Sequence, residues 1–344
     1  MKAAVLMEKK QIVIKDVPTP QIAKDEVLIE VACIGVCGSD VHYYEHGRIG
    51  RYIVESPIIL GHEVAGTVVA TGDQVSKVKV GDRVAIEPGV TCGRCDYCKQ
   101  GRYNLCPDVE FMATPPYDGA WAEYVKCRED FLFVLPDELT FEEGALLEPL
   151  SVGVHALLRA DVKPYDKVLI TGLGPIGQLA AAAGRLLGVH EIYGSDVVDF
   201  RRQLGKNQFF QDVCDPSNLA DKAAEWTGGQ GFDVIIESSG NDKAISSTPS
   251  LVKKGGKIVL IGLSSNSQVS LNTNEIVDGE IDLHGVFRYA NTYPKTLTLL
   301  KHNRIDMDPF ITHRYSLDHI QDALHTAIEQ KDNSMKIMIY PKGC

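Results

Sequence analysis

The sequence lacks an apolar run long enough to cross a lipid bilayer. A membrane-spanning helix needs roughly 18–20 consecutive apolar residues, whereas the longest apolar stretch, Leu179 to Leu187, is short and is interrupted by Arg185. The N-terminus, Met1 to Glu8, has the pattern of a short strand and no long apolar core of the kind found in signal peptides. We therefore expect a soluble, cytoplasmic protein that does not bind membranes.

The chain also has no excess of positive charge. It contains 35 Lys and Arg residues against 46 Asp and Glu residues, which gives a net charge of −11. A surface of this sign repels phosphate backbones and anionic lipid headgroups. Nucleic acids and membrane surfaces are therefore poor candidate partners.

The sequence predicts two domains of different type. The 344 residues exceed the roughly 100–200 residues of a typical domain. Residues 1–150 are rich in Gly, Pro and β-branched residues, and predict a mostly-β domain. In residues 151–285, short apolar strands such as 168–170 alternate with helical segments, which indicates a doubly wound parallel sheet of the α/β class. From about 286 to 344 the chain is expected to complete the first domain.

A glycine-rich loop follows the strand at 168–171 and precedes a helix. It reads Gly172-Leu173-Gly174-Pro175-Ile176-Gly177. In such a loop the first glycine permits a tight turn, the second lets a pyrophosphate approach the backbone, and the third lets the helix pack on the strand. The free N–H groups at the helix start bind the phosphates. The pattern predicts a dinucleotide site, although a plain glycine turn is the alternative.

Asp196 stands nineteen residues beyond Gly177, after the second apolar strand. An acid here accepts hydrogen bonds from the ribose hydroxyls and repels a 2′-phosphate, so NAD is favoured over NADP. Arg201 and Arg202 lie nearby and weaken this preference. The alternative is that Asp196 is only a surface acid.

Four of the nine cysteines fall within one short segment. Cys92, Cys95, Cys98 and Cys106 have the spacing C-x2-C-x2-C-x7-C. The odd total and the clustering favour a metal over disulfides. Four thiolates match a closed, tetrahedral structural Zn²⁺ site. An iron–sulfur cluster and a redox thiol pair remain alternatives.

A second set of potential ligands is spread along the chain. Cys37, His62, Glu63 and Glu148 supply one thiolate, one imidazole and two carboxylates. Each residue alone is weak evidence, because single Cys and His residues are often structural. Together they suit a catalytic zinc that keeps a position for substrate. Such a metal, next to a nicotinamide, promotes hydride transfer from an alcohol to NAD.

Taken together, these motifs resemble those of the zinc-containing medium-chain alcohol dehydrogenase superfamily, specifically its sorbitol (polyol) dehydrogenase branch. The resemblance covers essentially the whole chain. The motifs that carry it are the four cysteines, the glycine loop and segments 37–40, 61–66 and 148–151. A simple alcohol dehydrogenase would more typically have Cys at position 148. Four further stretches are typical of the polyol branch: 42–50, 113–119, 147–153 and 285–289.

The resemblance implies a GroES-like catalytic domain, a Rossmann domain, and a role for each matching residue. Cys37, His62 and Glu63 would bind the catalytic zinc, with Glu148 close by and acting directly or through water. Ser39 and His42 would relay a proton, although Ser39 could instead cap a helix. Pro175, Ile176 and Arg201 would join the glycines and Asp196 in binding NAD. The polyol pocket would comprise Tyr43, Phe111, Thr114, Glu148, Arg288 and Tyr289.

One segment departs from the family pattern. After Asp196 the family usually reaches a Leu-Gly-Ala step before the next strand, and here residues 200–210 lack it. Gly205 instead falls inside the predicted helix, where it costs about 1 kcal/mol relative to Ala. The geometry on the adenosine side of the cofactor is therefore in question. For Arg288 and Tyr289, the alternative is a surface pair on a strand.

The resulting hypothesis is an NAD-dependent zinc polyol dehydrogenase similar to L-iditol 2-dehydrogenase. It would oxidise the C2 hydroxyl of a sugar alcohol such as sorbitol or xylitol to a ketose. Family resemblance suggests a homotetramer or a dimer. One alternative is another zinc alcohol dehydrogenase, of the butanediol or threonine type. The other is a non-catalytic structural or sensor protein that binds zinc and a dinucleotide.

Overall fold

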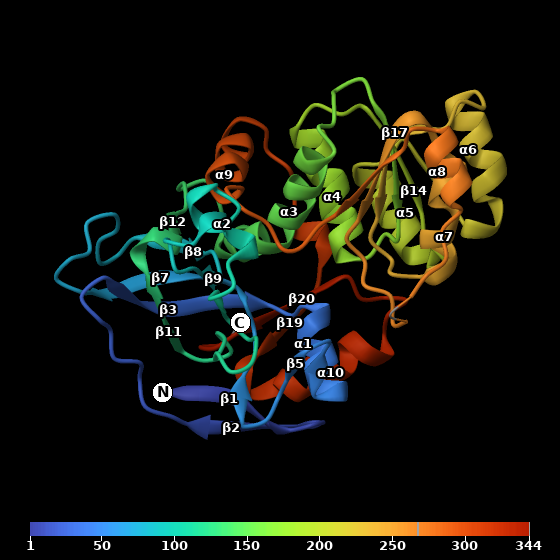
Figure 1. Ribbon diagram of the computed structural model, residues 1–344. Coiled ribbons are helices and arrows are strands. Elements are labelled where there is room, and N and C mark those ends of the chain that lie inside the picture. The colour runs from blue at the N-terminus through green and yellow to red at the C-terminus, as the bar shows by residue number, and fades with distance from the viewer. Residues whose placement is uncertain (267, 344) are drawn as a thin grey trace. The chain divides into compact units, whose positions relative to one another are not determined.

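The computed structural model describes residues 1–266 and 268–343 (Figure 1). Their contacts divide the chain into two units, Met1–Glu148 with Asp306–Cys344, and Pro149–Ile305. The second unit includes helix α9 (Tyr293–His302), in which the Tyr293 ring centroid lies 5.8 Å from that of Tyr289. The chain thus re-enters the first unit at Asp306 and not near residue 286. Among the described residues, no helix combines the length and apolar character needed to span a membrane.

The first unit is built on a seven-stranded, largely antiparallel sheet. Its central strand, β3 (Glu26–Gly35), alternates buried and half-buried residues, as expected for a strand with one face on the core. Strand β3 pairs with β7 (Glu63–Thr71), β11 (Tyr124–Arg128) and β20 (Lys336–Tyr340). The remaining strands of this sheet are β8 (Arg83–Ile86), β12 (Leu132–Val134) and β19 (Ile311–Ser316). The C-terminal strand therefore lies beside the N-terminal part of the chain.

Short elements decorate this sheet. The fully buried Trp121 is among the largest side chains of the core beneath them. The helices are α1 (Gly38–His46), α2 (Asp96–Lys99) and α10 (Ile320–Glu329), and α3 (Phe141–Arg159) leads into the second unit. The small sheets comprise β1 (Lys2–Glu8), β2 (Gln11–Asp16), β4 (Arg48–Ile49), β5 (Tyr52–Ile53), β6 (Ile58–Ile59), β9 (Gly89–Val90) and β10 (Glu110–Phe111).

The second unit contains a six-stranded sheet in which every pairing is parallel. The strand order is β15-β14-β13-β16-β17-β18, so the winding reverses between β13 and β16. This order is that of the dinucleotide-binding doubly wound fold, and ligands bind at the carboxyl ends of the strands where the order reverses. The strands are β13 (Lys167–Thr171), β14 (Glu191–Ser195), β15 (Asp212–Cys214), β16 (Phe232–Glu237), β17 (Val252–Leu260) and β18 (Asp282–Gly285).

Helices cover both faces of this parallel sheet. Figure 1 shows α4 on one side and α7 and α8 on the other. Helix α4 buries nine of its twelve residues, which fits its Ala- and Leu-rich sequence. The helices are α4 (Pro175–Leu186), α5 (Asp199–Gln208), α6 (Leu219–Thr227), α7 (Asp242–Leu251) and α8 (Thr273–Asp278). The predicted combination of a mostly-β domain and a doubly wound domain is confirmed.

Candidate functional site

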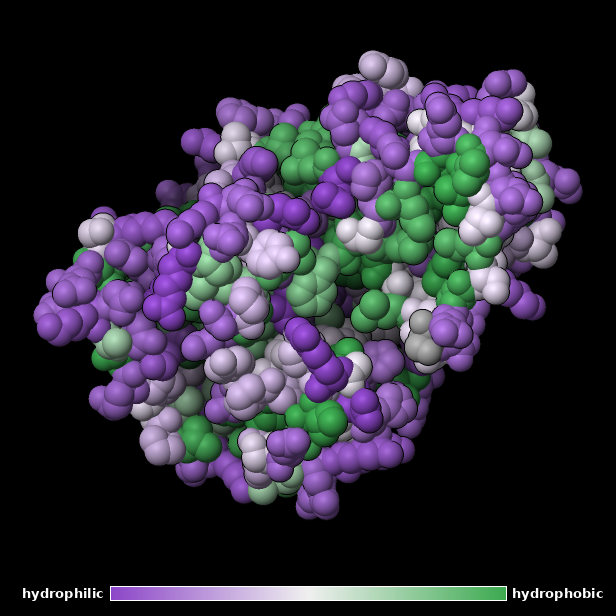
Figure 2. Space-filling view, viewed as in Figure 1, coloured by the Kyte–Doolittle hydropathy of each residue, from purple (hydrophilic) through white to green (hydrophobic). Residues whose placement is uncertain are grey.

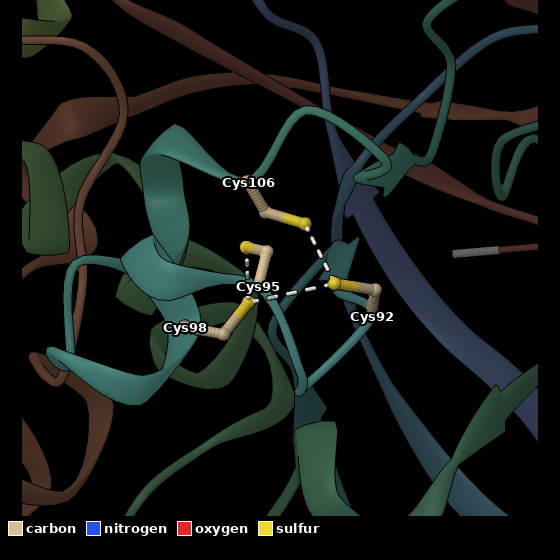
Figure 3. Close-up of side chains that lie close together, drawn as sticks. All are labelled: Cys92, Cys95, Cys98 and Cys106. Carbon is tan, nitrogen blue, oxygen red and sulfur yellow. Dashed lines mark hydrogen bonds between the residues drawn. The ribbon is translucent and has the colours of Figure 1, made fainter.

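The four clustered cysteines converge in the first unit, around the short helix α2 (Figure 3). The Sγ atoms of Cys95 and Cys98 lie 3.5 Å apart, as do those of Cys92 and Cys106, and Cys92 and Cys98 are 4.0 Å apart. A disulfide requires about 2.05 Å. Four thiolates about 2.3 Å from a tetrahedral zinc lie about 3.8 Å from one another. The observed separations therefore fit a single tetrahedral ion and exclude disulfides.

The backbone around this group favours the thiolate form of one cysteine. Hydrogen bonds from the amides of Arg94 and Cys95 lower the pKa of Cys92 to about 6. Because thiolates and not thiols bind zinc, such donors prepare the loop for a metal. The four sulfur atoms would fill all four positions of a tetrahedral ion. Such an ion has no coordination position left for a substrate.

A second ligand group lies elsewhere in the first unit. One ligand atom each from Cys37, His62 and Glu63 fall within 4.8 Å of one another. Cys37 is the N-cap of α1, and Glu63 is the first residue of β7. His62 and Glu63 are buried, and Cys37 is half-buried. Sulfur, nitrogen and oxygen donors in this number suit a zinc ion with a further position open.

Glu148 is buried in α3 but does not belong to that group of mutually close ligand atoms. Its charge nevertheless reaches the group, because it contributes to the raised pKa of His62. The placement fits a carboxylate near the metal more closely than a fourth direct ligand.

Asp40 is a site residue to which the sequence analysis gave no role. Its carboxylate is fully buried and accepts hydrogen bonds from the amides of Cys37, at 2.9 Å, and Gly61, at 3.1 Å. Its Oδ1 lies 3.7 Å from His62 Nδ1. Burial alone would lower the pKa of His62, but the charges of Cys37 and Asp40 outweigh it and raise that pKa to about 10. Asp40 thus acts on the imidazole through its charge, from a position similar to that of carboxylates behind metal-binding histidines.

Lys336 is a second residue that the sequence analysis missed. Its buried ammonium group donates to both carboxylate oxygens of Glu63, each at 2.7 Å, and to the carbonyl of Val36 at 3.1 Å. The one feature of the sequence that could have identified it is a charged lysine at the start of the otherwise apolar strand 336–340. Burial lowers the pKa of Lys336, but the negative charge of Glu63 raises it, and the net effect is a raised pKa.

The residues expected to relay a proton lie on α1, just after Cys37. Ser39 is half-buried and His42 is exposed. The N-cap of this helix is Cys37, so Ser39 does not serve as the capping residue. A hydroxyl and an imidazole on one short helix, at increasing exposure, are suitably placed to carry a proton toward solvent.

The residues expected to line the substrate pocket divide between the two units. Tyr43 and Phe111 are buried in the first unit, and the Phe111 ring centroid lies 5.7 Å from that of His62. The Thr114 amide donates to the Phe111 carbonyl at 3.0 Å, which fixes that loop. Arg288 and Tyr289 belong to the second unit and follow the end of β18, so neither lies in a strand.

The backbone at Arg288 is left-handed, with φ of 53°. Its guanidinium carbon lies 4.8 Å from the centroid of the Phe287 ring, and Tyr289 is buried. A left-handed conformation is uncommon for a residue with a side chain of this size.

The glycine loop has the shape that a pyrophosphate requires. Gly172 has a φ of +83°, and a Cβ there would lie 2.6 Å from the Ser239 amide nitrogen. A Cβ on Gly177 would lie 1.9 Å from the Gly172 carbonyl oxygen. A Cβ on Gly174 would meet only Arg201 Nη1, at 3.8 Å. The first and third glycines are thus needed by the fold, whereas the second leaves its surface open for a ligand.

Pro175 and Ile176 complete this loop as the first residues of α4. Proline fits the first helical position because its missing N–H has no partner inside the helix. The following amides remain directed at the loop and can bind phosphate oxygens.

Asp196 stands one residue beyond β14 and is buried. Its Oδ2 accepts from the Leu173 amide at 2.6 Å, and its Oδ1 accepts from the Val198 amide at 2.8 Å. Each oxygen keeps a second lone pair, so the carboxylate is fixed next to the glycine loop and can still accept from a ribose.

The two arginines after Asp196 differ in their surroundings. Arg202 donates to the Asp196 carbonyl at 2.6 Å and pairs with Asp199 and Asp215. Arg201 places Nη1 3.9 Å from Asp196 Oδ2, and in the described part of the chain its buried Nε has no hydrogen-bond acceptor. Arg201 therefore faces the loop with donors to spare, whereas Arg202 supports the fold.

Gly205, which departs from the family pattern, lies within the continuous helix α5. A Cβ there would lie 2.8 Å from Cδ2 of the Phe210 ring. Glycine is thus required by close packing, and the helix after Asp196 forms despite the cost of glycine.

Comparisons with known proteins agree with this arrangement. Residues 23–137 match the family model of the alcohol dehydrogenase GroES-like domain, and residues 175–302 match that of the zinc-binding dehydrogenases. The chain is 47% identical over 343 residues to the sorbitol dehydrogenase of Bacillus subtilis, covering 99% of this chain and 97% of the relative.

Two solved structures are similar over nearly their whole length. An oxidoreductase of unknown specificity from Escherichia coli has a TM-score of 0.94 at 39% identity, with 98% of each chain covered. The 2R,3R-butanediol dehydrogenase of Bacillus subtilis has a TM-score of 0.90 at 32% identity, with 99% of each chain covered.

Proposed function

Because the chain belongs to the zinc-containing alcohol dehydrogenases, in the branch of the sorbitol dehydrogenases, we propose that it is an NAD-dependent polyol dehydrogenase. Its reaction is the oxidation of a secondary hydroxyl, at C2 of a sugar alcohol such as sorbitol or xylitol, to a ketose. The observation that carries this proposal is the convergence of Cys37, His62 and Glu63 within 4.8 Å. That donor set supports a catalytic metal, and the second unit has a loop shaped for a dinucleotide.

The ligand group and its neighbours would hold the catalytic zinc. Cys37, His62 and Glu63 supply the donor atoms, and Glu148 contributes a nearby carboxylate. When bound, the zinc supplies Lewis acidity toward the substrate oxygen, and NAD accepts the hydride. Asp40 holds the His62 ring in position through its charge, at 3.7 Å.

The alcohol proton needs a route away from a largely buried site. Ser39 would take up that proton as it gives its own hydroxyl proton to the cofactor ribose, and His42, the more exposed of the two residues, would pass a proton on to solvent. A histidine is suited to this step because its usual pKa lies near neutral pH.

Six side chains would select a polyol over a simple alcohol. Polyols present several hydroxyl groups, so a pocket for them needs hydrogen-bonding groups as well as apolar walls. The aromatic rings supply walls, and the hydroxyl, carboxylate and guanidinium groups supply hydrogen bonds. The proposed lining residues are Tyr43, Phe111, Thr114, Glu148, Arg288 and Tyr289.

The cofactor would lie at the carboxyl ends of the parallel strands. The pyrophosphate would approach Gly174, where a Cβ would meet only Arg201 at 3.8 Å, and Asp196 would accept hydrogen bonds from the ribose hydroxyls. Arg201 would donate to the cofactor through its Nε–H group, which has no acceptor among the described residues. Gly172, Pro175, Ile176 and Gly177 shape the loop around these contacts.

The four-cysteine site would hold a second, structural zinc. Cys92, Cys95, Cys98 and Cys106 would supply all four ligands of the ion, so the ion would order the lobe and would not bind substrate.

We also propose a cytoplasmic homo-oligomer, either a tetramer or a dimer. Strand β18 pairs with β17 on one side, and within the described residues no strand pairs with its other edge. Figure 2 shows apolar side chains gathered over the region that Figure 1 labels α7 and α8. In this unit Leu283 of β18 and Val277 of α8 are 43% and 73% exposed. An open edge with apolar neighbours favours association with a second copy.

The test of this function is the formation of NADH or NADPH in the presence of sorbitol, xylitol, 2,3-butanediol and threonine, each with NAD and with NADP. Polyol-dependent NADH formation that stops on chelation and returns with Zn²⁺ supports the proposal. Faster turnover of butanediol or threonine would assign the chain to another branch. Cofactor binding without turnover of any alcohol would favour the non-catalytic alternative.

A further inference from the structure

Lys336, the first residue of β20, is almost wholly enclosed by protein. Its side chain is 3% exposed, and the Glu63 side chain beside it is 1% exposed. Leaving such a charge without a partner costs several kcal/mol, so its partners are tightly constrained. The acceptors around Lys336 therefore indicate what this buried charge does.

Every donor of the ammonium group has an acceptor. Lys336 Nζ lies 2.7 Å from each carboxylate oxygen of Glu63 and 3.1 Å from the carbonyl oxygen of Val36. A lysine ammonium has three N–H donors. Two of the three are thus directed at one carboxylate, and the third ties the group to the end of β3.

Gly35 also lies against this carboxylate. This residue pairs with Glu63 in the ladder between β3 and β7. A Cβ at position 35 would lie 2.0 Å from Glu63 Oε2, which leaves no room for any side chain. The Glu63 carboxylate therefore lies close to the backbone of Gly35 and accepts two hydrogen bonds from the ammonium of Lys336.

The same carboxylate belongs to the ligand group with Cys37 and His62. A thiolate and a carboxylate present two negative charges to a divalent cation, and Lys336 offsets one of them. An oxygen that already accepts a hydrogen bond from a cation donates less to a metal, and the positive charge itself repels a second cation. These effects oppose the binding of a metal at this site.

We propose that Lys336 is a positioning residue of the catalytic metal centre: it fixes the Glu63 carboxylate in the ligand group and limits how strongly that carboxylate holds the metal. The inference rests on the proposed metal site. Lys336 lies in the C-terminal strand, 273 positions from Glu63. None of the metal-ligand motifs in the sequence includes it.

The test compares the wild-type protein with Lys336→Met, which keeps the length of the side chain and removes its charge. The rate at which a chromophoric chelator removes each zinc is measured, together with the visible absorption bands of the Co²⁺-substituted protein. In K336M we expect one of the two metal ions to be released about tenfold more slowly, a change on the scale of those from residues behind metal ligands. The Co²⁺ bands should shift, and Lys336→Arg should restore both readouts toward wild type.

A matched control is Lys257→Met. Lys257 is partly buried in the second unit and donates to the Ala160 carbonyl at 2.7 Å, so it is a lysine with no part in either ligand group. K257M should leave both release rates and the Co²⁺ bands unchanged. If K336M does not fold, Lys336→Gln provides the same comparison, because its amide can donate to Glu63 but carries no charge.

Two outcomes would overturn the inference. Release from the folded variant that is about tenfold faster would mean that Lys336 only supports the ligands. Release rates and Co²⁺ bands that match wild type would mean that it does not act on the metal. Absence of the proposed metal site is distinguishable from both, because wild-type protein would then bind only the zinc of the four-cysteine site, and turnover of another alcohol leaves the release rates interpretable.

Discussion

The Oδ1 atom of Asp40 lies 3.7 Å from Nδ1 of His62, and the Asp40 side chain is completely buried. The same carboxylate accepts hydrogen bonds from the amides of Cys37 and Gly61. One acid thus connects the two segments that carry the sulfur and nitrogen donors of the proposed catalytic site. Its position indicates that it organises the metal centre without touching the ion.

Asp40→Asn should weaken metal binding at this site by about 10–100-fold, which is typical when a carboxylate behind a metal-binding histidine is removed. The amide retains the size of the side chain but not its charge. Chelator competition on the purified protein measures the effect, with Asp221→Asn on the exposed face of α6 as control. An unchanged metal affinity in D40N would show that Asp40 only accepts hydrogen bonds from the backbone and does not support the metal site.

Cys98→Ser should remove one zinc per chain and lower the thermal stability of the protein. Its sulfur lies 3.5 Å from that of Cys95 and 4.0 Å from that of Cys92, so its loss opens the tetrahedral set. Metal analysis and thermal melting measure the two effects. Cys214→Ser, at a buried cysteine of the second unit, is the control for metal content. A folded C98S protein with both zinc ions would contradict the assignment.

Gly174→Ala and Gly177→Ala should separate cofactor binding from folding. At position 177 a methyl group would lie 1.9 Å from the Gly172 carbonyl, so G177A should be destabilised. At position 174 it would meet only Arg201 Nη1 at 3.8 Å, so G174A should melt as wild type does while its Kd for NAD rises about tenfold or more. Melting curves and NADH fluorescence titrations provide the comparison. Wild-type NAD affinity in G174A would place the pyrophosphate elsewhere.

The buried carboxyl of Glu87 should make stability depend on pH. Burial raises its pKa from 4.5 to about 7, although the hydrogen bond from the Tyr103 hydroxyl, at 2.6 Å, opposes that shift. The unfolded chain releases this proton at lower pH than the folded protein does. The stability associated with a protonated Glu87 is therefore complete below about pH 4.5 and is lost as the pH rises through about 7.

Glu87→Gln tests this directly, because the amide accepts from Tyr103 and never ionises. Relative to wild type, E87Q should gain on the order of 1–2 kcal/mol of unfolding free energy between pH 5 and pH 8. Urea denaturation at the two pH values measures the difference. Tyr103→Phe should lower stability by about 1 kcal/mol through loss of the hydrogen bond. A stability difference between E87Q and wild type that does not vary with pH would contradict the account.

Local sequence patterns predicted much of the fold. The alternation at 27–31 marks β3, and the glycine loop marks the turn from β13 to α4, because both patterns arise from neighbours along the chain. The cysteine spacing likewise predicted a compact ligand group, which the sulfur positions match. By contrast, the contacts extend the second unit to Ile305, beyond the predicted end at 285. The helix at 293–302 has no local signal in the sequence that assigns it to either sheet.

Long-range pairs could not be predicted from such patterns. In the sequence Asp40 appeared only as part of a motif, and its place near His62 depends on the approach of α1 to Gly61, whose amide donates to Asp40. Lys336 reaches Glu63 across 273 positions, through the pairing of β20 with β3 and of β3 with β7. A lysine in an apolar strand suggests a buried partner, but nothing local identifies that partner as a metal ligand.

The most direct test of the central claim is zinc content measured alongside polyol-dependent NADH formation, as the metal is removed and restored stepwise. The account predicts two zinc ions per chain, with turnover lost as the ion of the Cys37, His62 and Glu63 group leaves and regained when it returns. Full turnover in protein that retains only the zinc of the four-cysteine site would contradict it.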